Sequence, residues 1–168
     1  MKPMYLLFVA CGSLLANQAP AQTDAEPKSA VPSFWKELPK GPQVFGYFEG
    51  RSPCQEIAKM LKVSGRDACI KIKWQLILYQ DPVTHAPTTY ALGGFAWRNP
   101  PRTGKWAIVK AAKEDPNAVV YQLDPDDPQG FLSFLKADDN ILFFLDNNRE
   151  LLVGNEQFSF TLNRVRDH

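Results

Sequence analysis

The chain has 168 residues, and its 19 Lys and Arg against 18 Asp and Glu give a formal net charge of +1 at pH 7. A near-neutral chain with no extended basic run does not suit the phosphate backbone of a nucleic acid, so we exclude nucleic-acid binding. No apolar run is long enough to span a bilayer, so we expect membrane contact only through a lipid anchor.

The N-terminus is expected to be a signal peptide over residues 1–21. Lys2 precedes a short apolar run at residues 5–16, and residues 19–21 read Ala-Pro-Ala. A basic start, a short apolar stretch and a small-residue A-x-A pattern are typical of secretory signals. We therefore expect cleavage after residue 21 and export, to the periplasm or to the outer membrane as an anchored lipoprotein.

Three cysteines bear on processing and folding. Residues 8–11, Phe-Val-Ala-Cys, resemble the box at which bacterial lipoproteins are cleaved and lipidated, so Cys11 is either removed with the signal or lipidated. Both routes leave Cys54 and Cys69 as one pair of thiols in an oxidising compartment, where pairing is expected. The sequence therefore predicts a Cys54–Cys69 disulfide, which stabilises the fold by about 3 kcal/mol in the chain-entropy model.

The first predicted elements follow a flexible tether at residues 22–43, which is rich in Pro, Ala, Ser and Lys. Residues 44–50 are typical of a strand. Apolar residues then fall at helical spacing over residues 52–61, with Ser52 as the expected cap and Pro53 at the first helical position. This is the one substantial helix that we expect.

After Cys69 the hydrophobic period changes to two, as in half-buried strands. Strands are predicted at residues 69–79, 88–98, 106–110, 118–123, 131–136, 141–145, 151–153 and 158–163, with a turn at 99–104 and a bulge or sharp bend at Gly93–Gly94. Eight or nine short strands joined by tight turns indicate an all-β antiparallel meander over residues 44–168. Closure into a small barrel removes the exposed edges, and a β-sandwich is the alternative.

No catalytic motif stands out. The two histidines, His85 in a turn and His168 at the end, lack a partner pattern, so we expect no enzymatic activity. Acidic residues at 124–127 and 138–139 could bind a hard cation through their oxygens, but they are also the residues that tight turns require, and we favour the turns. Cys54, Cys69, His85 and Met60 are copper ligands by type, but a disulfide removes both thiolates. We therefore expect no metal and no cofactor.

Aromatic residues on neighbouring predicted strands suggest a ligand site. Core packing is the simpler interpretation, and a pocket for a small hydrophobic ligand is the second. The residues concerned are Tyr47, Trp74, Tyr90, Phe95, Trp97 and Trp106.

Residues 48–54, Phe-Glu-Gly-Arg-Ser-Pro-Cys, followed by Ile57, resemble the NlpE-like family of bacterial envelope lipoproteins. That family opens its N-terminal barrel with an aromatic-x-Gly-x-x-Pro-Cys segment and a short helical turn. Shorter matches lie at residues 104–106, 121–123, 145–146 and 161–164. The resemblance implies a lipocalin-like barrel at the cell envelope, linked to copper tolerance and to the reporting of envelope stress.

The chain departs from the family at Ile57, where the family's Pro-Cys-x-x-Cys has its second cysteine. The resemblance therefore does not imply a copper or redox role through C-x-x-C, and Cys69 takes the place of the disulfide partner. We expect a stress-sensing or binding accessory module with an envelope protein partner. The alternative is a carrier of a small hydrophobic ligand in the barrel interior.

Overall fold

The computed structural model describes residues 38–64, 68–95, 97–110, 115, 117–127 and 131–166, with residues 97–99 described by their backbone alone. The expected signal segment, Cys11, His168 and the tether up to residue 37 lie outside these residues. No helix in the described part is long and apolar enough to cross a membrane.

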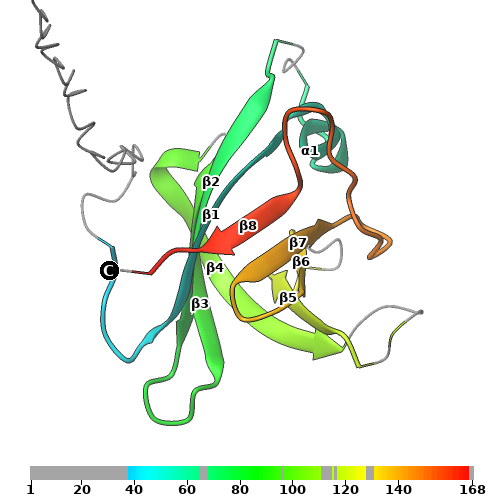
Figure 1. Cartoon of the computed structure of the whole chain (residues 1–168). Coiled ribbons are helices and arrows are strands. Elements are labelled where there is room, and N and C mark those ends of the chain that lie inside the picture. The colour runs from blue at the N-terminus through cyan, green and yellow to red at the C-terminus, as the bar shows by residue number, and fades with distance from the viewer. Residues whose placement is uncertain are drawn as a thin grey trace, which may run out of the picture. The chain divides into compact units, whose positions relative to one another are not determined.

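The described residues form eight antiparallel strands that close into a barrel (Figure 1). Each strand pairs with its neighbours in the chain, and β1 also pairs with β8 to close the barrel. The elements are β1 Val44–Pro53, α1 Gln55–Met60, β2 Lys71–Gln80, β3 Pro87–Gly94, β4 Trp97–Lys110, β5 Val119–Leu123, β6 Ser133–Lys136, β7 Ile141–Leu145 and β8 Thr161–Arg164. The predicted small antiparallel meander barrel with one short helix near its start is confirmed.

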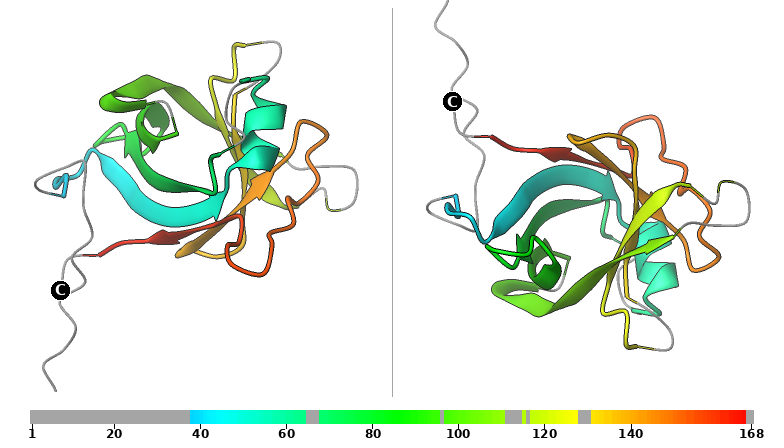
Figure 2. Two further views of the ribbon diagram at one scale, coloured as in Figure 1. Left: turned by 90° about the horizontal axis from the view of Figure 1, so that it is seen from above. Right: turned by 90° about the horizontal axis from the view of Figure 1, so that it is seen from below.

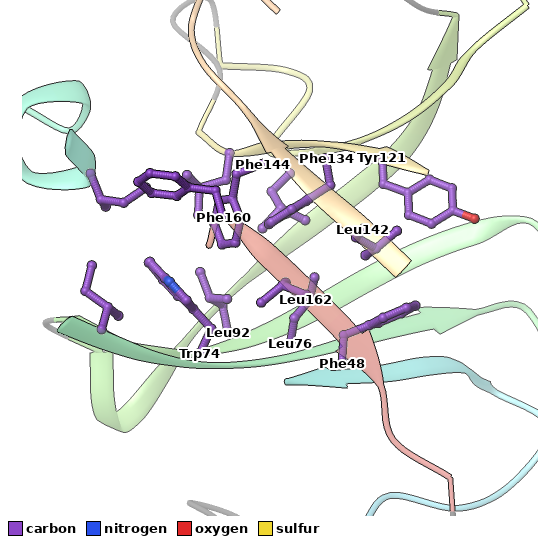
Figure 3. Close-up of a cluster of buried hydrophobic side chains, with 14 of the residues drawn as sticks. Phe48, Trp74, Leu76, Leu92, Tyr121, Phe134, Leu142, Phe144, Phe160 and Leu162 are labelled. Carbon is purple, nitrogen blue, oxygen red and sulfur yellow. The ribbon is translucent and has the colours of Figure 1, made fainter. Parts of the chain in front are cut away.

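Alternating side chains fill the barrel interior, because successive residues of a strand point to opposite faces of the sheet. On β2, Ile72, Trp74 and Leu76 point inward, whereas Lys71 and Lys73 are exposed. The interior cluster is 0–8 % exposed throughout. Figure 3 shows it as a continuous layer between the strands, with Trp74, Phe48, Tyr121, Phe134, Phe144, Phe160 and Leu162 among its members.

A second, smaller cluster lies on the outer face of the sheet. Tyr47, Ile77 and Ala91 stand opposite one another on β1, β2 and β3, and they are only 1–5 % exposed. Partly buried residues pack against them, namely Leu38, Val44, Tyr79 and Val165. The middle of β2 is therefore buried on both faces, whereas simple alternation predicts burial on one.

The predicted turn at residues 99–104 is wrong, because these residues belong to β4. The turn between β3 and β4 begins at Phe95, which has a φ of 50°. The register shifts between Leu92 and Gly94, so that residues 98–101 stand opposite Gly93. Two prolines fall in this irregular stretch, where the N–H that proline lacks costs no regular ladder bond.

Helix α1 is shorter than predicted and begins with Cys54 at its N-cap. Ser52 and Pro53 belong to β1 instead, in register with Ile72 and Lys71 of β2. Ser52 does not cap the helix, because its buried hydroxyl accepts a hydrogen bond from Trp74 Nε1 at 2.8 Å. A tertiary contact thus overrides the local capping pattern.

The predicted disulfide between Cys54 and Cys69 is present. It joins the N-terminus of α1 to the segment just before β2. Ile57 and Ala58 of α1 are buried in the interior cluster, so the disulfide holds the helix against one end of the barrel.

The closing contact between β1 and β8 is short. Three residue pairs form the ladder, Phe48 with Arg164, Glu49 with Asn163 and Gly50 with Leu162. Gly50 is needed there, because a Cβ at this position would lie 2.2 Å from the carbonyl oxygen of Thr161. We call this contact the closing seam.

The last two predicted strands, at residues 151–153 and 158–163, differ from the observed structure. Leu151 makes only an isolated bridge with Leu145, and β8 begins at Thr161 rather than at residue 158. Phe160 is nevertheless buried in the interior cluster, so its alternation signalled burial and not the start of the ladder.

Candidate functional site

The aromatic residues predicted to line a pocket do not share one cavity. Trp74, Tyr90, Phe95 and Trp106 belong to the interior cluster and are 1–8 % exposed. Tyr47 lies in the outer cluster, on the opposite face of the sheet. The side chain of Trp97 lies outside the described residues.

The polar ends of these interior aromatics are occupied by structural hydrogen bonds. Trp106 Nε1 donates to the carbonyl oxygen of Tyr79 at 2.6 Å. The Tyr90 hydroxyl donates to Asp124 Oδ2 at 2.8 Å, and Arg102 donates to both partners at 3.0 and 2.7 Å. Burial, followed by the hydrogen bond to Asp124, raises the pKa of Tyr90 well above its usual value. These bonds hold the polar ends of the rings in the packed barrel.

A groove of about 420 Å³ lies where the start of β1 meets the end of β8. Figures 1 and 2 show these two segments side by side near the C-terminus. Its apolar walls are Leu38, Pro39, Val44, Phe45, Tyr47 and Val165. Its polar groups come from Asp139, Arg164 and Arg166. We call it the seam groove.

Arg164 is the best-fixed side chain of the seam groove. Its Nη1 donates to the carbonyl oxygen of Phe45 at 2.8 Å, and its Nε donates to that of Asp139 at 2.6 Å. The guanidinium lies 4.6 Å from the ring centroid of Phe48, within cation–π range. Gly46 leaves room for it, because a Cβ there would lie 2.4 Å from Nη1. Burial lowers the pKa of Arg164.

The charges around the seam groove are unbalanced. Asp139 is ion-paired with Lys136 at 2.7 Å, and the hydrogen bond from Lys136 lowers the pKa of this carboxyl group. Arg166 is exposed and donates to Asn140 Oδ1 at 2.9 Å. Within the described residues, neither Arg164 nor Arg166 forms an ion pair with a carboxylate. The groove therefore presents two cations beside an apolar wall.

Of the predicted pocket residues whose side chains are described, Tyr47 alone lines the seam groove. Its hydroxyl donates to Glu49 and accepts a hydrogen bond from Gln75 Nε2 at 2.5 Å. Gln75 is only 3 % exposed, so these contacts satisfy a buried amide. They fix the ring of Tyr47 in the groove wall.

The residues weighed as metal ligands serve other roles. Asp124 pairs with Arg102, and Asp126 lies 3.6 Å from Lys105. Asp138 Oδ1 accepts the backbone N–H groups of Asn140 and Ile141, as tight turns require. Over the described residues, no group of three or more His, Cys, Asp or Glu side chains is placed to hold a metal ion.

The sequence does not single out most of the seam groove, because its walls come from the two ends of the domain. Val44 and Arg164 become neighbours only when β1 and β8 close the barrel. The available signal was two arginines alternating with Val165 at the end of the last strand. No protein-family model, no curated protein and no solved structure matches this chain.

Proposed function

We propose that this chain is an exported, non-enzymatic binding module of the bacterial cell envelope, which reports on envelope conditions through what it binds at the seam groove. One observation carries the proposal. The barrel interior is packed with side chains that are 0–8 % exposed, whereas the seam groove is open and presents Arg164 and Arg166, to which the described residues supply no ion-paired carboxylate.

Features of the sequence support the location. The signal-like segment at residues 1–21 directs export, and the Cys54–Cys69 disulfide is of a kind that persists in oxidising compartments. The resemblance of residues 48–54 to NlpE-like lipoproteins favours an envelope-stress role.

The function is tested with an envelope-stress reporter in the native host. Deletion of the gene should change the reporter response to copper or to a reducing agent, and the wild-type gene should restore it. The R166E variant should restore it poorly, because it reverses a charge in the groove. R51E makes the same charge change at an exposed site of β1 outside the groove and should restore the response fully. A reporter unaffected by deletion would refute the proposal.

Location is tested by the intact mass of the mature protein from the native membrane fraction. The mass gives the cleavage site, the state of Cys11 and the presence of the disulfide together. A full-length mass in the cytoplasmic fraction would contradict export.

The alternative function, a carrier of a small hydrophobic ligand, requires space inside the barrel. The packing of the interior cluster argues against it. Native mass spectrometry of the purified protein detects any co-purifying ligand, and amide NMR then separates the two functions, because a carrier holds its ligand against the interior cluster and not at the seam groove.

A further inference from the structure

The seam groove has the dimensions of a small-molecule site. Pockets for small ligands are typically about 300–1,000 Å³ and are mostly apolar, with a few fixed polar groups. The seam groove has about 420 Å³, is open to solvent, and combines aliphatic walls that include Leu38, Val44 and Val165 with a comparable amount of polar surface. A protein partner requires about 800 Å² of surface on each side, which is far more than this groove offers.

The charged groups of the seam groove determine which sign of charge a ligand should carry. Arg164 is half-buried and is held in place by two backbone carbonyl oxygens, so its remaining N–H donors keep a fixed direction. The planar guanidinium pairs well with a carboxylate, and two such groups lie in this groove. Asp139 attracts both arginines but is one carboxylate against these two and Lys136, so the four charged groups together remain net positive.

The apolar wall and the two arginines therefore favour the binding of a molecule with an anionic head and an apolar body. We propose that the seam groove binds a small amphipathic carboxylate, with its carboxylate group on Arg164 and Arg166 and its hydrocarbon chain against Leu38, Val44 and Val165. The inference rests on the proposed binding function and names its ligand class. It places the ligand at the closing seam and not in the barrel interior.

Dodecanoate is a suitable probe, used below its micelle concentration on the mature protein. We expect saturable binding by calorimetry. Amide NMR shifts should change at Val44, Val165 and Arg166 and not in the middle of β6 and β7. Dodecanol lacks the charge and acetate lacks the chain, so each should bind at least about 10-fold more weakly, as loss of a charge-assisted hydrogen bond or of apolar burial implies. Raising the salt concentration should also weaken dodecanoate binding.

Arg164→Ala is a poor test, because Arg164 also holds Phe45 and Asp139. R166E is preferable, because Arg166 is exposed and makes one hydrogen bond, to Asn140. It should weaken dodecanoate binding by about 10-fold or more, and R51E should leave the affinity unchanged. V44S, in the apolar wall, should weaken dodecanoate binding and leave acetate binding unchanged.

Three outcomes would overturn the inference. They are equal affinity for dodecanol and dodecanoate, equal weakening by R166E and R51E, and NMR shifts centred on the interior cluster. Binding without any reporter phenotype would refute the proposed function and leave the site standing. A reporter phenotype of R166E without dodecanoate binding would refute the ligand and leave the function standing.

Discussion

At the scale of single residues, buried polar side chains of this barrel hydrogen-bond to one another across strands. The hydroxyl of Ser52 is fully buried and accepts a hydrogen bond from Trp74 Nε1. Ser52→Ala would leave the indole N–H without a partner, so we expect unfolding to become easier by about 1–3 kcal/mol. Urea denaturation measures this change. Ser64→Ala, at an exposed position, should stay within about 0.5 kcal/mol of wild type, and equal effects of both variants would refute the assignment.

Tyr90 predicts a specific dependence of stability on pH. Its folded-state pKa is raised by burial above the unfolded value of about 10, so its contribution is complete below pH 10 and is lost as pH rises toward the folded pKa. Tyr90→Phe should be less stable at pH 7 by about 1.5 kcal/mol, because Asp124 and Arg102 lose a partner. The difference in unfolding free energy between the wild type and Tyr90→Phe should decrease above pH 10. Parallel curves of unfolding free energy against pH would contradict this.

At the scale of elements, the stability of α1 depends on the disulfide more than on the helix-forming tendency of its own sequence. It has only six residues and no side-chain cap, which is too short for stability in isolation. Reduction, or replacement of both Cys54 and Cys69 by Ala, should cost about 3 kcal/mol. By hydrogen exchange, the amides of Ala58 and Leu61 should lose protection before those of the β2–β3 ladder. Uniform loss across the barrel would show that the disulfide supports the whole fold instead. A reductant should not affect the double variant.

The element scale also shows where sequence reasoning works. Period-two alternation located β2, β5 and β7 within a few residues, because the alternation of apolar and polar residues along a strand can be seen in the sequence of that strand alone. It failed at β4, since Asn99, Pro100 and Pro101 are typical turn residues. Their place in the strand depends on the register shift opposite Gly93, which is a property of the β3–β4 pair. The seam groove was missed for a similar reason, because Arg164 and Val44 meet only in three dimensions.

At the scale of the whole molecule, the barrel is closed by a ladder of three residue pairs between its first and last strands. Gly50→Ala would place a Cβ 2.2 Å from the carbonyl oxygen of Thr161, a backbone atom that cannot move without displacing β8. We expect destabilisation by about 1–3 kcal/mol, as for other overpacked sites, measured by urea denaturation. Asn163→Ala changes an exposed side chain on the same ladder and should stay within about 0.5 kcal/mol of wild type. An unperturbed Gly50→Ala variant would mean that β8 shifts freely.

The short closing seam also sets the order of events during folding. Every other ladder joins strands adjacent in the chain, whereas Arg164 Nη1 reaches the Phe45 carbonyl across 119 residues. Such long-range contacts are expected to form late in folding, after the ladders between neighbouring strands. Because the groove has one wall from each end of the domain, a ligand there binds only the fully closed form. By mass action the ligand would stabilise the closed barrel. The fraction of protein with ligand bound would therefore depend both on the ligand concentration and on the completion of folding.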